Sequence, residues 1–301
     1  MSVALDRVSS LPWPQILSLE MSTKCTADCY ICPRRMIERK DREMPVEDIF
    51  RITREACEMG VRRISPHLWG EPTMHSHYVE ILHYFKGLKR EYPDVAFLEY
   101  TNGSGWGDIE VCRAQQDVFD KIVVSIDGAD HKTMRENRPG LDPAVIDENV
   151  KGFMDLRERR GLEKPLVYLR MTVMPRTEGQ EEAYRKKWLP YVDEVAFLPL
   201  QNFDESLVEE VDLREGRPCD RLFYQIVVTV NKNVVLCCSD YNELFILGNL
   251  GDHTLRDLWF GGKMGAVRRL HLEGRSAEVP LCRACTYRTY LSEGEDGGRS
   301  K

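Results

Sequence analysis

Short apolar runs alternate with longer amphipathic stretches along most of the chain. Runs rich in β-branched residues predict strands, and apolar residues spaced three or four apart predict helices. Strands are predicted at 15–21, 61–68, 95–100, 121–126, 166–174 and 195–200, and helices at 45–59, 78–90, 108–119, 144–160 and 181–191. Turn-forming residues such as Thr101-Asn102-Gly103 and Asp127-Gly128 close two of the strands. The pattern is therefore a strand–helix repeat.

Six such repeats in about 190 residues predict an α/β fold with a parallel sheet, curved into a partial (β/α)6 TIM-like barrel. A plain Rossmann-type sheet is the structural alternative. No G-x-G-x-x-G follows the first strand, so that alternative lacks its phosphate-binding turn. Chemistry in a barrel of this kind is expected at the carboxyl ends of the strands.

The pattern changes after about Asn202. An acidic loop at 203–216 is followed by two alternating runs, 224–230 and 234–237, which predict a hairpin turning at 231–233. Helical spacing recurs at 254–260 and 266–271. The predicted organisation is an N-terminal extension (1–14), the barrel (15–203), a small α+β domain (204–291) and a disordered tail (292–301).

Composition excludes several classes of function. Lys and Arg number 42 and Asp and Glu 49, so the formal net charge of −7 offers no electrostatic footprint for nucleic acid. No run of about 18 apolar residues predicts a membrane span, and the first 24 residues lack the pattern of a secretory signal. Ten cysteines in such a chain are expected to be metal ligands or core thiols in a reducing cytoplasm.

Three cysteines, Cys25, Cys29 and Cys32, follow the first predicted strand. Thiolates are the usual hosts of iron–sulfur clusters, and three of them leave one iron of a cubane cluster open. Zinc binding and three core cysteines are the alternatives. Cys-x3-Cys-x2-Cys with the apolar Ile31 before the last cysteine resembles the signature of the radical S-adenosylmethionine (radical SAM) superfamily. In that family the open iron binds SAM, and the reduced [4Fe–4S] cluster cleaves it to a 5′-deoxyadenosyl radical.

A second set of cysteines lies near the C-terminus: Cys219, Cys237, Cys238, Cys282 and Cys285. Spacing alone leaves zinc and an iron–sulfur cluster equally open, since four thiolates suit both. In context the segment resembles the SPASM/twitch extension of radical SAM enzymes. That resemblance implies one auxiliary [4Fe–4S] cluster on Cys219, Cys237, Cys282 and Cys285, with Cys238 as the alternative to Cys237.

Three further segments resemble SAM-binding motifs of the family. Trp69-Gly70-Glu71-Pro72 resembles Gly-Gly-Glu-Pro, with Trp69 departing from the first glycine. Asn102 stands in the turn expected near the SAM ribose. Ser125-Ile126-Asp127-Gly128, followed by Arg135, resembles the segment whose serine and arginine meet the SAM carboxylate, a group that a guanidinium grips bidentately.

The layout is similar to radical SAM enzymes of the 2-deoxy-scyllo-inosamine dehydrogenase type, which serve antibiotic biosynthesis. This implies an oxidoreductase that oxidises a secondary alcohol of an aminocyclitol, aminosugar or related small molecule. The auxiliary cluster would take the second electron. Candidate catalytic residues are His67, Arg170, Cys238 and Asp240. A flavodoxin- or ferredoxin-type reductant is expected as partner, and neither nucleic acid nor a membrane.

Two other reactions stay open. A sugar epimerase needs a cysteine that donates a hydrogen atom, and Cys238 is the candidate, because Cys57 and Cys112 lie in predicted helices as core thiols. A peptide-modifying SPASM maturase often carries an N-terminal recognition domain. Only about 24 residues precede the first cysteine motif, which disfavours that alternative.

Overall fold

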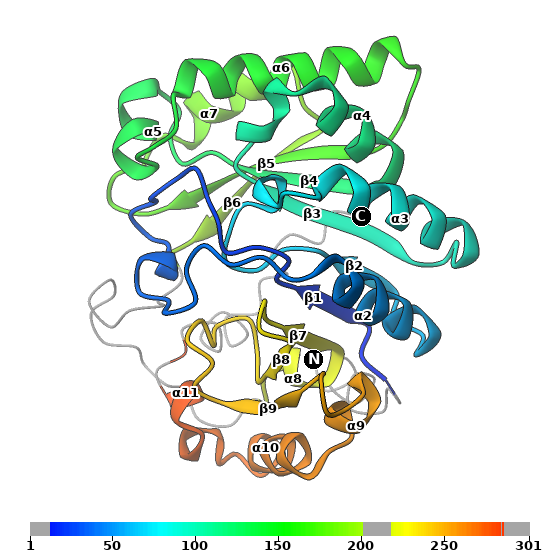
Figure 1. Ribbon diagram of the computed structural model, residues 1–301. Helices are drawn as coiled ribbons and strands as arrows, with labels where there is room; N and C mark the ends of the chain where they lie inside the picture. Colours follow the sequence, from blue (N-terminus) through cyan, green and yellow to red (C-terminus); the bar gives the residue numbers. More distant parts are fainter. Residues whose placement is uncertain (1–12, 201–217, 284, 286–301) are drawn as a thin grey trace.

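A computed structural model describes residues 13–200, 218–283 and 285 (Figure 1). Within these residues one nine-stranded sheet runs through the molecule in the order β6-β5-β4-β3-β2-β1-β7-β8-β9. The strands are β1 (Ile16–Leu19), β2 (Arg63–Ser65), β3 (Ala96–Thr101), β4 (Lys121–Ser125), β5 (Leu166–Val173), β6 (Glu194–Pro199), β7 (Gln225–Val228), β8 (Asn233–Val235) and β9 (Ile246–Asn249).

Helices connect the strands and follow them. The α-helices are α2 (Val46–Glu58), α3 (Tyr78–Glu91), α4 (Ile109–Val118), α5 (His131–Asn137), α6 (Pro143–Arg159), α7 (Glu181–Trp188), α8 (Arg221–Tyr224), α9 (Leu255–Trp259), α10 (Gly262–Leu272) and α11 (Pro280–Arg283). Short 3₁₀ helices are η1 (Pro33–Arg35), η2 (Pro72–Met74), η3 (Ser104–Gly107) and η4 (Ser276–Glu278).

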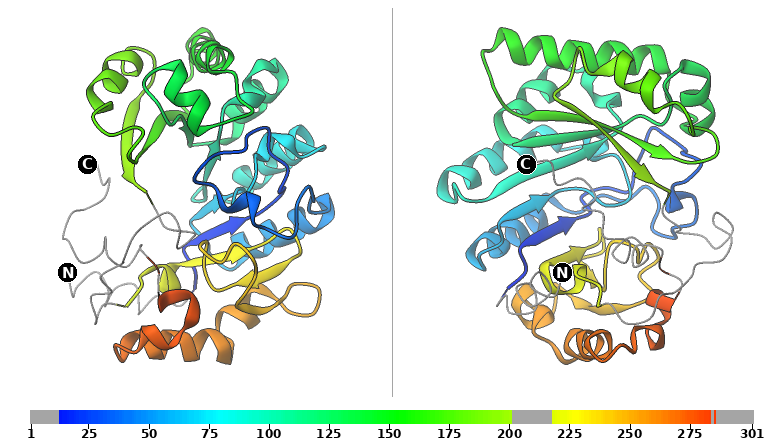
Figure 2. Two further views of the ribbon diagram at one scale, coloured as in Figure 1. Left: turned by 90° about the vertical axis from the view of Figure 1, so that its left-hand side faces the viewer. Right: turned by 180° about the vertical axis from the view of Figure 1, so that it is seen from behind.

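Strands β1 to β6 pair in parallel and in sequence order, with helices packed on one face of the sheet (Figures 1 and 2). This is the predicted partial barrel. Because parallel strands end at a common edge, the loops after β1 to β5 gather there. The cysteine loop, the Trp69 turn and the end of β4 are therefore neighbours in space.

Strand alternation divides the side chains between two faces. On β5, Val167, Leu169 and Met171 are fully buried, and the alternating Tyr168 and Arg170 are only partly buried. The buried set packs under the helices, where Phe85 of α3 meets Phe97 of β3 at a ring-centroid distance of 5.2 Å. The opposite, concave face carries the polar residues that form the barrel lumen.

The C-terminal elements extend the same sheet. Strand β7 pairs in parallel with β1, and β8 and β9 follow antiparallel. The β7–β8 hairpin confirms the prediction, with Val228 opposite Val234. In Figure 1 these yellow and orange elements lie beyond β1, on the side away from β6. The second cysteine set is thus joined to the barrel by backbone pairing.

Three of the differences from the prediction have physical reasons. Strand β2 ends at Ser65 because Pro66 has no N–H to continue the ladder. Strand β9 was not predicted, since its four residues include Gly248 and depend on β8 as a partner. Helix α5 was not predicted either, because only Met134 and Asn137 of its seven residues are buried.

The predicted acidic loop (203–216), the proposed boundary near 203 and the predicted disordered tail (292–301) lie outside the described residues. No helix in the described part of the chain has the length and apolarity to cross a bilayer.

Candidate metal and cofactor centre

The first cysteine loop lies between β1 and α2. Cys29 is buried, whereas Cys25 and Cys32 are partly exposed, and all three are free thiols. The loop is pinned to the end of α5, because the N–H groups of Asp28 and Tyr30 donate to the carbonyls of Pro139 and Asn137. The Cys32 N–H also donates to the Cys29 carbonyl at 3.1 Å, which folds the loop back on itself. One short loop therefore presents three thiols together.

A buried arginine faces this loop. Arg138 donates to the Cys29 Sγ at 3.5 Å and forms a salt bridge of 2.7 Å with Asp127. Asp127 is held in turn by the Thr172 N–H at 2.7 Å. The guanidinium is thus fixed beside the loop, where its positive charge favours a thiolate.

Desolvation dominates the acidity of the three thiols. Burial raises the pKa of Cys25 to about 12 and of Cys32 to about 11, and it also raises the pKa of Cys29. Thiolates are costly here unless positive charge compensates them. Iron binding supplies that charge and releases the protons, so this donor set fits a cluster.

Glu71 joins the turns after β2 and β3. Its carboxylate is buried and accepts from the Thr101 hydroxyl and the Asn102 N–H, both at 2.7 Å. Asn102 donates through Nδ2 to the Thr26 hydroxyl at 3.0 Å and lies 3.7 Å from the Cys25 Sγ. The Trp69 turn, Asn102 and the cysteine loop therefore form one connected unit.

Gly70 lets two turns approach closely. A Cβ at this position would lie 2.2 Å from the Ser22 carbonyl oxygen, which no ordinary contact allows. Trp69 stands where the motif has its first glycine, but the contact that requires a glycine is at Gly70. The departure at Trp69 therefore leaves the close approach intact.

Gly70→Ala is expected to lower the free energy of unfolding by about 1–3 kcal/mol, because the new methyl group displaces backbone. Weaker SAM binding should accompany the loss. Chemical denaturation and SAM titration measure the two effects. Gly87→Ala in α3 is the matched control, since a Cβ there meets no atom within 4 Å and should stabilise the helix by about 0.5–1 kcal/mol. Equal stability of Gly70→Ala and wild type would contradict this account of the turn.

Three neighbouring strands bring polar side chains into the lumen. Arg170 of β5 donates to the hydroxyl of Ser125, the last residue of β4, at 3.2 Å. The guanidinium lies 5.3 Å from the centre of the Tyr100 ring, and His67 lies 5.5 Å from the same ring. Burial, and then the charge of Arg170, lower the pKa of His67 to about 3, so its imidazole is neutral. The structure thus brings together His67, Ser125 and Arg170 as a candidate substrate surface.

The second cysteine set also converges. Burial raises the pKa of Cys237, and the neighbouring thiols of Cys238, Cys219 and Cys285 raise it further. Burial raises the pKa of Cys219 to about 12, with Cys285 adding to the effect. Cys237 therefore lies near Cys238, Cys219 and Cys285, and the choice of Cys237 over Cys238 as a ligand stays a prediction.

Cys238 lies on the barrel side of the hairpin. It packs with Trp69 against a small apolar cluster of Leu68, Val227 and Val235, and the Arg221 Nη1 donates to its Sγ at 3.0 Å. The thiol is therefore near the Trp69 turn. Cys57 and Cys112 are 5% and 3% exposed, which confirms them as core thiols.

Two predicted residues have other surroundings. Arg135 is exposed on α5, and Arg138, three residues later, is the arginine that faces the cysteine loop. Asp240 is buried, and its two oxygens accept from the N–H groups of Leu244 and Phe245. This geometry gives Asp240 a turn-forming role, and its part in proton transfer stays a prediction.

Sequence reasoning missed Arg138 and His271. Asp127 was the available signal for Arg138, since a buried carboxylate beside a strand end requires a cation. His271 lies in α10, buried between the backbone of Cys219 and the thiol of Cys282. Its single available signal was its position 11 residues before Cys282.

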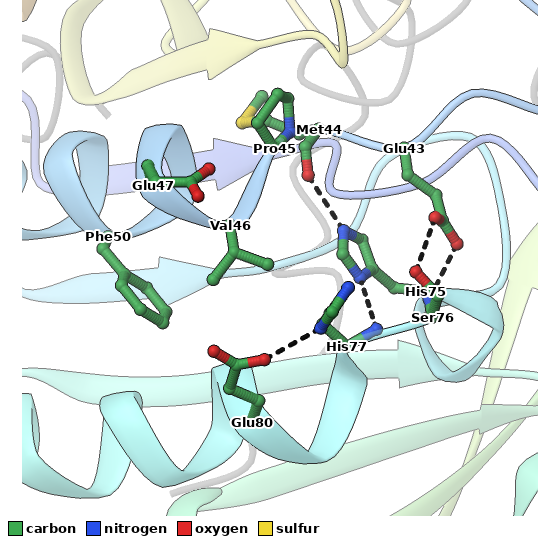
Figure 3. Close-up of a pocket in the computed structure, with 10 residues that line it drawn as sticks. All are labelled: Glu43, Met44, Pro45, Val46, Glu47, Phe50, His75, Ser76, His77 and Glu80. Carbon is green, nitrogen blue, oxygen red and sulfur yellow. Dashed lines mark hydrogen bonds and ion pairs between the residues drawn. The ribbon is translucent and has the colours of Figure 1, made fainter.

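A pocket of about 440 Å³ opens between the N-terminal ends of α2 and α3 (Figure 3). Its polar side chains other than Glu47 have partners within the structure. His75 bonds the Met44 carbonyl, His77 bonds Glu80, and Glu43 accepts from Ser76. None of the predicted site residues lines it. In the described part of the chain, no three His, Cys, Asp or Glu side chains surround the position of a single metal ion, so the fit of the cysteine loop to a cluster rests on its three thiols and their neighbours.

The fold and the two cysteine sets define a class of protein. The model of the radical SAM superfamily matches residues 19–186, so the chain belongs to that superfamily. A SPASM model, an iron–sulfur cluster-binding domain, matches residues 219–286. The chain is therefore a radical SAM enzyme, and this class holds a [4Fe–4S] cluster with SAM and an auxiliary iron–sulfur cluster.

Among known proteins, the chain is 23% identical over 276 residues to the S-adenosyl-L-methionine-dependent 2-deoxy-scyllo-inosamine dehydrogenase of Niallia circulans, covering 90% of this chain and 92% of that protein. It is 31% identical to a probable GTP 3′,8-cyclase of Methanothermobacter marburgensis, but over 119 residues, 40% of this chain and 37% of that protein.

Solved structures share the fold at lower identity. BtrN in complex with AdoMet and 2-DOIA superimposes with a TM-score of 0.57 at 19% identity, over 90% of this chain and 92% of that chain. Streptococcus suis SuiB bound to the precursor peptide SuiA gives a TM-score of 0.73 at 17% identity. The match covers 98% of this chain and 76% of that chain.

Proposed function

We propose that this enzyme oxidises a secondary alcohol of a small hydroxylated molecule, such as an aminocyclitol or aminosugar, to the ketone. The observation that carries the proposal is the meeting of His67, Tyr100 and Arg170 in the lumen, at the strand ends that also hold the cysteine loop. The 23% identity to a dehydrogenase over nearly the whole of both chains supports it.

When bound, SAM and the two clusters supply a 5′-deoxyadenosyl radical and an acceptor for one electron. The oxidation removes from the alcohol carbon one hydrogen atom, and from the resulting ketyl radical one proton and one electron. The products are a ketone, 5′-deoxyadenosine and methionine, with the electron passed to the acceptor and the proton to solvent. The role of this chain is to hold the C–H bond in place and to receive the proton.

Arg170 orients the substrate. One guanidinium nitrogen donates to Ser125, and the ring of Tyr100 supports the group from one side. Within the described residues no carboxylate forms a salt bridge with Arg170, so its remaining donors are available to hydroxyl oxygens of the substrate. A guanidinium fixed in this way binds two neighbouring oxygens with defined geometry.

His67 receives the hydroxyl hydrogen. Its pKa of about 3 keeps the imidazole neutral, so that one ring nitrogen accepts a hydrogen bond throughout the physiological range. The same low pKa makes the imidazole a weak base, so His67 holds the hydroxyl by this hydrogen bond and the proton goes on to solvent. Acidification to about pH 5 should therefore leave this step unaffected, since His67 becomes charged only near pH 3.

Product mass tests the function. Protein reconstituted with iron and sulfide is incubated with reductant, SAM and a panel of aminocyclitols, aminosugars and related alcohols. We expect a product lighter by two hydrogens, with one 5′-deoxyadenosine per turnover. Deoxyadenosine formation together with a modified peptide, and no oxidised alcohol, would replace the proposal with a peptide maturase.

Arg170→Gln is expected to lower kcat/KM about 10–100-fold, because hydrogen bonds from a charged donor contribute about 1.5–3 kcal/mol. Most of the effect should be on the coupling of SAM cleavage to substrate oxidation, so that more 5′-deoxyadenosine than ketone is formed. Chromatographic quantification of both products measures it. Arg113→Gln, at an exposed position of α4, is the matched control. Unchanged coupling in Arg170→Gln would remove Arg170 from the substrate site.

A second candidate function is epimerisation, which the position of Cys238 favours. Its thiol packs with Trp69 beside the SAM-binding turn and can return a hydrogen atom to a substrate radical. An epimerase leaves the mass unchanged in water and incorporates one solvent deuterium in D2O. Cys238→Ala would then stop turnover, whereas in a dehydrogenase it would leave ketone formation intact.

The electron that begins each turnover is expected to come from a flavodoxin- or ferredoxin-type protein of the cytoplasm. Ten free cysteines among the described residues support a reducing compartment.

A further inference from the structure

One imidazole connects two cysteines of the second set. His271 of α10 is 1% exposed. Its Nδ1 lies 3.1 Å from the N–H of Cys219, and its Nε2 lies 3.3 Å from the Sγ of Cys282. Cys219 lies 52 residues before His271 in the chain, and Cys282 lies 11 residues after it. His271 therefore connects the segment before α8 with helix α11.

The partners fix which nitrogen carries the proton. A backbone N–H can only donate, so Nδ1 of His271 must be the acceptor. The proton of the neutral ring therefore lies on Nε2 and points at the sulfur of Cys282. Helix α10, which bears His271, and helix α11, which bears Cys282, both lie in the C-terminal part of the molecule (Figure 1), and η4 lies between them in the chain and packs against both.

A hydrogen bond to a cluster thiolate withdraws negative charge from the sulfur. Reduction adds an electron to the cluster, so the donor stabilises the reduced state more than the oxidised state and raises the reduction potential. Arg221 adds positive charge on the hairpin side, through its contact with Cys238. Both features favour a cluster that accepts electrons.

We propose that His271 is a positioning residue that raises the reduction potential of the auxiliary cluster by donating its Nε2–H to Cys282. The inference rests on the proposed function, in which the cluster accepts the electron of the substrate radical. A tenfold change in that electron-transfer equilibrium corresponds to about 59 mV for one electron.

Two substitutions of His271 by amide side chains separate the effect of the hydrogen bond to Cys282 from the effect of packing. In His271→Gln the longer amide reaches the position of Nε2 and can still donate to Cys282. In His271→Asn the shorter amide replaces Nδ1, so it accepts from Cys219 but does not reach the sulfur. Both fill part of the same buried space, and His253→Asn at an exposed position of the same domain is the control.

The measurement is a redox titration followed by electron paramagnetic resonance, with Cys25, Cys29 and Cys32 replaced by alanine so that the auxiliary cluster alone contributes. We expect a lower potential in His271→Asn, and the parent value in His271→Gln and His253→Asn. Equal potentials in His271→Asn and the parent would overturn the proposal, as would a parent without an auxiliary cluster. The titration needs no substrate and is therefore independent of the proposed function. If the potentials shift as expected but no alcohol is oxidised in the dehydrogenase assay, the proposed function is wrong and the role of His271 stands.

Discussion

Replacing Cys29 by alanine is expected to reduce 5′-deoxyadenosine formation to the background of the iron-free protein. Cys29 is the buried member of the first set, and its sulfur accepts from Arg138. Without it two thiolates remain, and two cannot hold the cluster whose open iron binds SAM. Iron should fall from about eight to about four atoms per chain, because the second set is untouched. Iron analysis and chromatography of the nucleoside measure the two effects.

The control and the complementary variant come from the same chain. Cys57→Ala removes a buried thiol of α2 that belongs to neither set, so iron and SAM cleavage should be unchanged. Cys282→Ala should also lose about four iron atoms but retain 5′-deoxyadenosine formation. If Cys29→Ala still cleaves SAM, the first loop is not the SAM-binding site.

The strand–helix repeat was readable from the sequence because its signal is local. The apolar periods of α2, α3 and α6 and the β-branched runs of β4 and β5 each specify an element without reference to the rest of the chain. The cysteine spacings are local in the same sense. The expected barrel and its chemically active edge followed from these features alone.

Features that depend on contacts between residues distant in the chain could not be predicted from the sequence. Glu99 was only one residue of a predicted strand, but it is buried under the helices, where Tyr78 and Gln115 donate to its carboxylate. Two arginines near Asp127 were equivalent in sequence, and helix α5 turns Arg135 outward and places Arg138 inward. Which of these side chains is buried depends on packing between segments that are distant in the sequence.

A buried ion pair holds the two halves of the molecule together. Arg39, in the segment after the cysteine loop, forms hydrogen bonds of 2.7 and 3.0 Å to Glu20, and the side chains are 4% and 0% exposed. Its other terminal nitrogen donates to the Tyr241 carbonyl in the β8–β9 connection. Glu20 also accepts from the Val230 N–H at 3.0 Å. The pair thereby fastens the C-terminal hairpin to the barrel.

Arg39→Met is expected to lower the free energy of unfolding by about 3–5 kcal/mol, because it leaves a buried carboxylate without its cation. Urea denaturation followed by circular dichroism measures the change. The control is Arg159→Met, which removes an exposed i,i+4 pair with Asp155 in α6 and should change stability by less than about 0.5 kcal/mol.

The double variant Glu20→Gln/Arg39→Met separates the charge from the packing. Glutamine can still accept from Val230 but carries no charge, so the double variant should be more stable than Arg39→Met alone. If both variants unfold at the same denaturant concentration, the cost comes from the lost contact with Tyr241 instead. An Arg39→Met protein as stable as Arg159→Met would show that the barrel and hairpin associate without this pair, through the β1–β7 ladder and the surrounding core.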